Sequence, residues 1–244
     1  MDRAYSCVHP IALGYDMSKK VDRIFSSIHN RYDLMNSVMS MGFDRVWRKR
    51  ASAEVLSHKK VERVLDVACG TGEFSIMLAK QMKKAGRRIS IEGIDMNAKM
   101  LSAGRVKIKG RYENIHLEVG DATNINRKSS SFDALTTAFA MRDFDSLERF
   151  AAESYRVLKK GGKIVALDMA EPDSRMQRLF FRCYSTMMKM EGMFVDKTAY
   201  DFLIESIHGF DKRRLAGILK AAGFRNVKIK NLETGIAFVA TGTK

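Results

Sequence analysis

Val64-Leu-Asp-Val-Ala-Cys-Gly-Thr-Gly-Glu73 is the stretch that decides the fold of this 244-residue chain. An apolar run leads directly into Gly70-Thr71-Gly72, and a helical pattern follows at once. Glycines at such a turn let the backbone bend sharply and let a ligand approach it closely. In an open α/β sheet, cofactors bind at the first strand-to-helix turn, beyond the carboxyl ends of the strands. The stretch therefore predicts a Rossmann-like sheet with a ligand-binding loop after its first strand.

Strand-like and helix-like patterns alternate after this loop. Short apolar runs predict strands at 63–68, 89–95, 115–120, 132–138 and 163–168. Helical spacing of apolar residues predicts helices between them at 72–84, 97–109 and 147–158. Short strands separated by such helices are typical of right-handed βαβ units in a mostly parallel sheet. Two final strands, at 226–232 and 235–241, are joined by Glu233-Thr234, a connection of hairpin length.

The sequence favours one α/β domain over residues 1–244. The expected architecture is a Rossmann-like, doubly wound, mostly parallel seven-stranded sheet with a C-terminal hairpin. Residues 1–20 are expected to form an arm, and helical spacing begins at Val21. Residues 172–212 are expected to form a helical lid after the fifth strand, and its first helix, 175–194, is rich in methionine.

The composition is that of a soluble globular protein, with 45% hydrophobic and 29% charged residues. The net charge of +15 attracts anionic partners such as phosphates, acidic lipids or nucleic acid, although a generally basic surface explains it equally well. Three scattered cysteines indicate a reducing compartment without disulfides, and no cysteine or histidine spacing resembles a zinc site. No apolar run matches a transmembrane helix or a signal peptide, so we expect a cytoplasmic protein.

Two further carboxylates follow predicted strands. Asp95 comes 23 residues after Gly72, where an acidic side chain accepts both ribose hydroxyls in nucleotide-binding α/β folds. Capping of the helix that begins near Asn97 is the structural alternative. Asp121 could accept from an adenine amino group or could be a simple turn residue. The dinucleotide pattern GxGxxG is absent, because Ser75 stands where its third glycine would be, and this disfavours a nicotinamide-dependent oxidoreductase.

These elements, in this order and spacing, resemble class I S-adenosylmethionine-dependent methyltransferases. Asp66, Gly70 and Gly72 match the first motif of that class, Asp95 its ribose-binding acid and Asp121 its adenine-side acid. The resemblance implies S-adenosylmethionine as cofactor, with S-adenosylhomocysteine as product and no metal. The cofactor contacts implied are Asp66, Ala68, Gly70, Thr71, Gly72, Asp95, Met96, Asp121, Ala122, Ala138 and Phe139.

Segments outside the glycine loop narrow the resemblance to the ubiquinone/menaquinone biosynthesis C-methyltransferases. The most specific are Arg31-Tyr-Asp-Leu-Met-Asn36 and Phe139-Ala-Met-Arg-Asp143. That family implies methyl transfer to a ring carbon of a reduced, prenylated quinone. Three departures bear on the site: Cys69 stands where the family commonly has glycine, Ala138 where it often has a cofactor-contacting serine, and Asp143 where it has asparagine. The last two put the substrate's identity in question.

The resemblance makes Arg142 the leading catalytic candidate. Arginine stays protonated, so it would stabilise a phenolate and orient a water that carries the proton away. A structural ion pair with Asp143 or Asp145 is the alternative. Tyr32 would close over the methionine end of the cofactor, with core packing as its alternative. Asp33 and Asn36 would cap a helix beginning near Leu34 or order the entrance loop.

The methionine-rich helix is the expected substrate lid, because flexible thioether side chains suit an isoprenoid tail. Four basic residues flank its apolar positions: Arg175, Arg178, Arg182 and Lys189. They would let the helix bind an anionic membrane surface, although solvated charges on an ordinary helix explain them equally well.

A methyltransferase of another small molecule stays open as an alternative function. An RNA methyltransferase is disfavoured, since no Asn-Pro-Pro-Tyr-type motif is present. A homodimer stays open.

Overall fold

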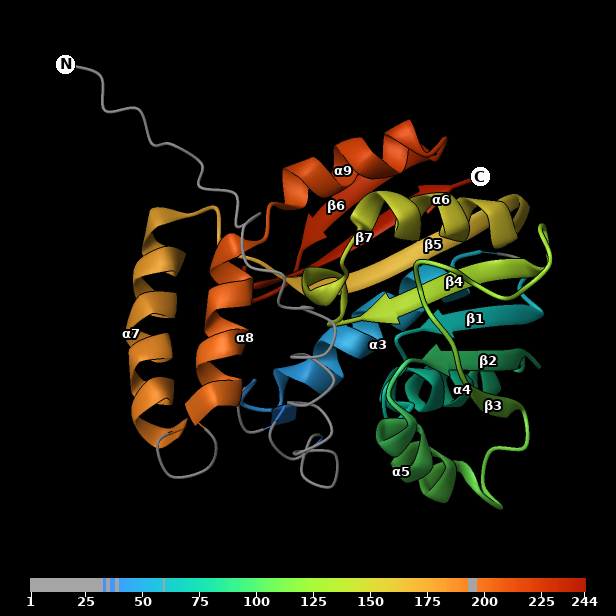
Figure 1. Ribbon diagram of the computed structural model, residues 1–244, viewed down its shortest axis with the longest axis horizontal. Coiled ribbons are helices and arrows are strands. Elements are labelled where there is room, and N and C mark those ends of the chain that lie inside the picture. Colours follow the sequence, from blue (N-terminus) through green and yellow to red (C-terminus); the bar gives the residue numbers. More distant parts are fainter. Residues whose placement is uncertain (1–32, 34–35, 38–39, 59, 193–196) are drawn as a thin grey trace.

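A seven-stranded sheet forms the centre of the molecule, with the strand order β3-β2-β1-β4-β5-β7-β6 (Figure 1). The computed structural model describes residues 33, 36–37, 40–58, 60–192 and 197–244. The strands are β1 Arg63–Val67, β2 Ser90–Asp95, β3 Ile115–Val119, β4 Phe132–Ala138, β5 Leu158–Met169, β6 Arg225–Asn231 and β7 Ala237–Thr243. The first five pair in parallel, and β7 runs antiparallel to both β5 and β6. The predicted fold class, including its C-terminal hairpin, is confirmed.

The helices are α3 Phe43–Leu56, α4 Glu73–Lys84, α5 Ala98–Ile108, the 3₁₀ turn η1 Met141–Asp143, α6 Leu147–Val157, α7 Arg175–Gly192, α8 Lys197–Gly209 and α9 Lys212–Ala221. Helices α3, α4 and α5 cover one face of the sheet, while α6 and α9 cover the other. Helices α7 and α8 stand side by side beyond the carboxyl ends of the parallel strands (Figure 1). The expected helical lid therefore lies at the edge where parallel sheets bind ligands.

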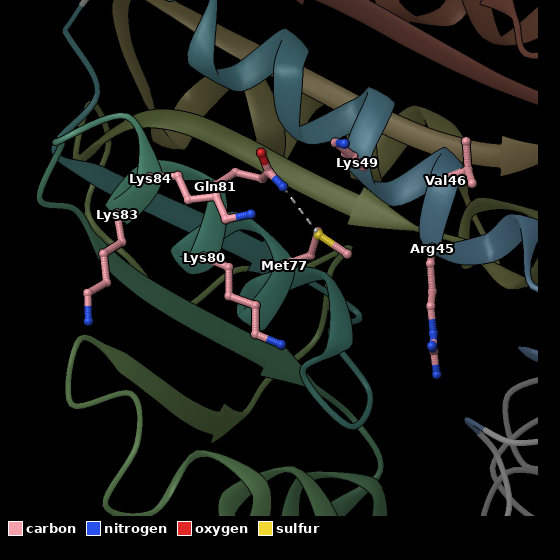
Figure 2. A pocket seen from close by; sticks show the side chains of 8 residues that line it. All are labelled: Arg45, Val46, Lys49, Met77, Lys80, Gln81, Lys83 and Lys84. Atoms are coloured by element: carbon pink, nitrogen blue, oxygen red, sulfur yellow. Dashed lines mark hydrogen bonds between the residues drawn. The ribbon is translucent and has the colours of Figure 1, made fainter.

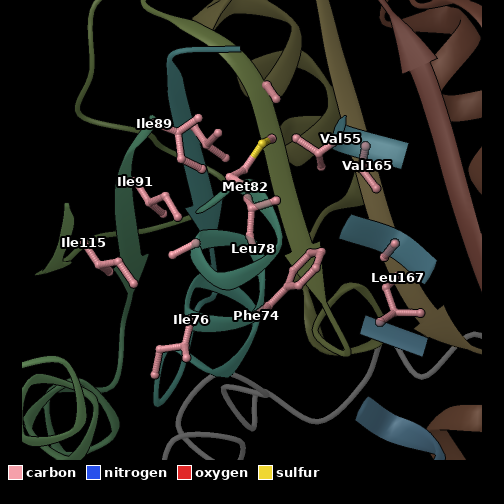
Figure 3. Packing of buried hydrophobic residues seen from close by; sticks show 14 of the residues in the cluster. Val55, Phe74, Ile76, Leu78, Met82, Ile89, Ile91, Ile115, Val165 and Leu167 are labelled. Atoms are coloured by element: carbon pink, nitrogen blue, oxygen red, sulfur yellow. The ribbon is translucent and has the colours of Figure 1, made fainter. Parts of the chain in front are cut away.

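Alternating residues of a strand pack into the two hydrophobic clusters on opposite faces of the sheet. In β5, Val165 and Leu167 join the cluster under α3 and α4 (Figure 3), whereas Ile164 and Ala166 join the cluster under α6 and α9. Parallel strands buried on both faces read as continuous apolar runs, because every side chain meets a helix layer. The sequence shows such a run at Ile164–Leu167.

Two predicted boundaries were wrong. Strand β5 begins at Leu158 rather than at 163, because Leu158 already pairs with Phe132 across an irregularity in the β4–β5 ladder. The Gly161-Gly162 pair lies inside this strand, where Gly161 adopts a φ of 80°. The hairpin connection is also longer than two residues, since β6 ends at Asn231 and β7 resumes at Ala237. The expected arm at 1–20 and nearly all of the helix expected from Val21 lie outside the described residues.

Candidate active site

The glycine loop adopts the conformation that its sequence demands. Gly70 and Gly72 have φ angles of 56° and 77°, the left-handed region that only glycine enters without strain. Ala68 reaches a φ of 51° despite its side chain, a strain of the kind that proteins hold at ligand sites. The loop is tied to the neighbouring strand, because the Gly70 amide donates to Asp95 Oδ2 at 2.8 Å. The backbone of this loop is thus fixed beside the end of β2.

Asp66 lies beneath the loop rather than on its surface. Its side chain is 1% exposed, and its two carboxylate oxygens accept hydrogen bonds from the hydroxyls of Ser75 (2.6 Å) and Thr136 (2.8 Å). Burial raises the pKa of this carboxyl group to about 6, although the two hydroxyls oppose the shift. Asp66 therefore joins the start of α4 to β4 and sets the position of the loop between them.

Asp95 stands at the junction of three segments. Its carboxylate accepts from the Gly70 amide and, at 2.8 Å, from the Asn97 amide, while its carbonyl accepts from the Gly120 amide at 3.0 Å. The alternative that it caps the next helix was wrong, because the side chain of Asn97 accepts from the first amides of α5. A carboxylate oxygen can accept more than one hydrogen bond, so this placement is compatible with accepting from a sugar.

The other residues expected on the nucleoside side follow β2 and β3. Met96 is 60% exposed directly after Asp95, and Ala122 is buried. Asp121 Oδ1 accepts from both the amide and the hydroxyl of Thr123, at 2.7 and 2.8 Å. This is the turn geometry that was the structural alternative for Asp121. Both hydrogen bonds of the turn go to the same carboxylate oxygen, Oδ1. Because β2 and β3 pair in parallel, these residues are gathered at one edge of the sheet with Asp95.

The end of β4 carries a second strained residue. Phe139 follows Ala138 with a φ of 62°, and its amide donates to the Leu167 carbonyl at 2.8 Å. Its ring does not face outward: it packs 6.2 Å from Trp47, with the Arg48 guanidinium 4.9 Å from the ring centroid. Ala68 and Phe139 thus mark the ends of β1 and β4, where the strand order reverses and doubly wound sheets bind ligands.

Arg142 is buried in an ion pair, with its side chain 3% exposed. Its Nε donates to Asp168 Oδ1 at 2.5 Å, and its Nη1 donates to the Ser206 hydroxyl on α8 at 2.8 Å. The alternative interpretation named Asp143 or Asp145 as its partner and was wrong about both, because β5 brings Asp168 alongside η1. Arg142 therefore links the ends of β4 and β5 to α8.

Asp143 occupies an unusual environment for a carboxylate. Its Oδ1 is buried and finds no hydrogen-bond partner among the described residues. Burial raises its pKa to about 6; the Arg142 charge opposes this shift, and the Asp168 charge adds to it. A buried acceptor without a partner weakens a fold, and an ionised one weakens it further. A carboxylate at position 143 is thus electrostatically costly in this chain.

Asp33 closes onto the glycine loop, an interaction that sequence reasoning did not identify. Its Oδ1 accepts from the Thr71 hydroxyl at 2.7 Å, and its Oδ2 pairs with Lys107 of α5. Lys107 also donates to Glu73 at 2.9 Å. Thr71 itself is 2% exposed, so its hydroxyl serves this link. The only sequence signal was the motif around Asp33, which suggested an entrance loop without naming its partners. Tyr32 lies outside the described residues.

Cys69 fits its place in the loop because the neighbouring strand offers room. A Cβ added to Gly93 in β2 would lie 2.9 Å from Cys69 Sγ, so the cysteine occupies the space over that glycine. Burial, followed by the charges of Asp95 and Asp66, raises the thiol pKa. A thiol held in its protonated form is a weak nucleophile, and Cys69 therefore acts as a packing residue.

Among the described residues, no three His, Cys, Asp or Glu side chains gather in a possible metal site.

This topology and glycine loop define the class. The fold matches a SAM-dependent methyltransferase from Thermotoga maritima with a TM-score of 0.61 at 21% identity, over 91% of this chain and 99% of that one. It also matches a Haemonchus contortus phosphoethanolamine N-methyltransferase in complex with S-adenosyl-L-methionine, with a TM-score of 0.58 at 12% identity, over 80% and 52% of the two chains. The fold is that of S-adenosylmethionine-dependent methyltransferases.

Sequence comparison then gives the family. Residues 15–244 match the ubiE/COQ5 methyltransferase family. A demethylmenaquinone methyltransferase of Deinococcus radiodurans is 38% identical over 96% of this chain and 97% of its own length. A ubiquinone/menaquinone biosynthesis C-methyltransferase UbiE of a Geobacter species is 37% identical over 94% and 100%. The chain belongs to the ubiE/COQ5 methyltransferase family, and is an S-adenosylmethionine-dependent methyltransferase.

Proposed function

We propose that this enzyme transfers the methyl group of S-adenosylmethionine to a ring carbon of a reduced, prenylated quinone. The names of its full-length relatives point to this substrate class. The observation in this chain that carries the proposal is the apolar surface of α7. On this helix, Met176 and Leu179 are 78% and 65% exposed. A long isoprenoid tail needs such a surface outside the polar cofactor site.

The first part of α7 has one exposed face. Phe181, on another side of the helix, supplies the packing against Ile207 and Ile236, whereas Met176, Leu179 and Cys183 are exposed. An exposed face that carries Met176 and Leu179 resembles an adaptable binding surface rather than interior packing. This favours the lid interpretation over core packing.

The residues at the strand ends suit the cofactor. The backbone of Gly70–Gly72 allows close approach of its amino-acid end, Asp95 would accept from its ribose hydroxyls, and Asp121 with Ala122 would border its adenine. Asp66 is proposed to act through the loop, because its oxygens already accept from two hydroxyls. Ala138 and Phe139 would contribute backbone at the β4 end. The bound cofactor supplies an activated methyl group on a sulfonium.

The protein's contribution to the chemistry is alignment and electrostatics. A ring carbon becomes nucleophilic when its neighbouring hydroxyl ionises, and a fixed cation favours that ionised form. Arg142 is the proposed cation, held by Asp168 and Ser206 in one orientation. Since Ser206 belongs to α8, this helix takes part in positioning the guanidinium. Tyr32 is proposed to cover the methionine end of the cofactor.

We further propose peripheral contact with an anionic membrane, where prenylated quinols reside. No helix in the described ranges combines the length and apolar character needed to cross a bilayer. Arg175 and Arg182 are exposed beside Met176 and Leu179, so α7 presents cations and apolar groups together. Basic amphipathic helices bind anionic lipid surfaces through this combination.

The experiment is incubation with labelled S-adenosylmethionine and a membrane extract, followed by mass spectrometry of the labelled product. Label on a quinone ring carbon supports the proposal. Label in RNA, or in a water-soluble small molecule, would contradict it. Replacing Met176 and Leu179 by serine should raise KM for a long-tailed quinol while leaving the affinity for S-adenosylhomocysteine unchanged.

A further inference from the structure

Helices α3 and α4 enclose a groove of about 570 Å³ on the face of the sheet opposite α6 and α9 (Figure 2). Its lining contains five cations and no carboxylate. The cations are Arg45 and Lys49 on α3 and Lys80, Lys83 and Lys84 on α4. All five are exposed, and none makes an ion pair within the described part of the chain. Elsewhere basic residues such as Arg127 and Lys159 do find carboxylates.

Helix chemistry does not explain this cluster. Arg45/Lys49 and Lys80/Lys84 are like-charged pairs four residues apart, a spacing that destabilises a helix. Arg45 also lies in the first turn of α3, where the helix dipole disfavours a cation. Only Lys83 and Lys84, in the last turn of α4, suit the dipole. An unpaired cluster that weakens its own helices is typical of a surface that meets an anion.

The groove also has apolar groups in its lining. Val46 is 40% exposed between the two α3 cations, and the half-buried Met77 forms the opposite wall, with its sulfur accepting from Gln81 Nε2 at 3.9 Å. Lysine stems add methylene groups while their charged ends reach outward. Free phosphate needs cations alone, and the lining has no aromatic side chain on which a nucleic acid base could stack. A phospholipid, in contrast, offers phosphate and hydrocarbon together. The chemistry of the groove therefore fits a lipid.

We propose that the α3–α4 groove binds the phosphate groups of anionic phospholipids and docks the enzyme on a membrane surface. The groove flanks the helix that begins at the cofactor loop, so docking here holds the catalytic domain itself against the bilayer. This proposal deepens the proposed function. It rests on that function in one respect, because a membrane-bound quinol substrate is the reason for the enzyme to bind a membrane. The methionine-rich lid is a separate surface at the strand ends.

The test is sedimentation of the full chain with vesicles of phosphatidylcholine, alone or mixed with phosphatidylglycerol. The variant is Lys49→Glu/Lys80→Glu/Lys84→Glu. Its matched control, Lys220→Glu/Lys228→Glu/Lys230→Glu, places the same charge change on exposed positions of α9 and β6. At the free energy typical of a basic side chain near an anionic surface, the groove variant should bind mixed vesicles roughly 100-fold more weakly. The control should lose much less.

Equal losses in the two variants would overturn the proposal, because they would reflect net charge alone. So would unchanged vesicle binding by the groove variant, or a groove-dependent affinity for single-stranded RNA that exceeds the one for vesicles. Unchanged affinity for S-adenosylhomocysteine shows that both variants are folded. Methylation of a short-tailed quinol in detergent tests the proposed function separately, since it needs no vesicle.

Discussion

Replacing Asp66 by asparagine is expected to flatten the pH dependence of stability. In the unfolded chain this carboxyl titrates near 3.8, and in the folded protein near 6. Between these values the folded state holds a proton that the unfolded state has lost. Raising the pH therefore lowers the free energy of unfolding, and the loss is complete above the folded pKa. The direction is opposite to that of a salt-bridged carboxylate.

The magnitude follows from the difference in pKa of about two units between the unfolded and folded states. At about 1.36 kcal/mol for each unit, ionisation of Asp66 costs about 3 kcal/mol. An asparagine side chain at this position cannot titrate, yet its amide can still bond the hydroxyls of Ser75 and Thr136, which rotate to donate or accept. Between about pH 4 and about pH 7, the wild type should thus lose about 3 kcal/mol more than the Asp66→Asn variant.

Urea unfolding at a series of pH values measures this difference directly. Subtracting the two curves removes the contribution of every other titrating group that the substitution leaves unchanged. Parallel curves would refute the reasoning, because they would mean that the buried carboxyl is solvated or paired more strongly than its two hydroxyl partners allow. The same variant should bind S-adenosylhomocysteine with an affinity that varies less across about pH 6 than that of the wild type.

Asp143→Asn should raise the free energy of unfolding near pH 8 and leave it almost unchanged near pH 4, as urea titrations will show, because the buried carboxylate is ionised only above about pH 6. Gly72→Ala should lower stability by about 1–2 kcal/mol in thermal unfolding; the added Cβ meets Leu117 only at 3.5 Å, so its φ of 77° carries the cost. Asp33→Asn should change stability by less than about 1 kcal/mol yet weaken S-adenosylhomocysteine binding in calorimetry, since the pair is partly exposed and tethers the loop. Arg142→Lys should lower kcat about 100-fold without altering that affinity; unchanged turnover would remove Arg142 from the chemistry.

Local patterns in the sequence were enough to predict the fold, because the strand and helix patterns of a parallel sheet repeat along the chain. The apolar run before Gly70 and the acidic residue at the end of β2 each depend on neighbours within a few residues. Strand boundaries were predicted wrongly where long-range pairing decided them, as at Leu158, which joins β5 through its pairing with Phe132. The glycine loop was similarly readable, since positive φ angles at Gly70 and Gly72 follow from residue type.

The sequence was less informative about what each polar side chain contacts. Asp66 and Asp95 are both aspartates near the ends of strands, yet their surroundings differ. Asp66 is buried beneath the glycine loop, whereas Asp95 accepts a hydrogen bond from the Gly70 amide of that loop. Arg142 gave no local sign of Asp168, which lies 26 residues away and reaches it only because β4 and β5 pair. Asp168 carried one usable signal, a carboxylate at the end of a buried strand.

By itself the sequence determined the sheet, its order of elements, the glycine loop and the family to which the chain belongs, because periodicity and motifs act over short distances. Only the tertiary structure decided which carboxylates are buried, that Asp33 fastens the loop to Lys107, and that five cations of α3 and α4 share one groove. Burial and charge proximity are properties of folded space, and residues far apart in the chain acquire them only when the helices pack on the sheet.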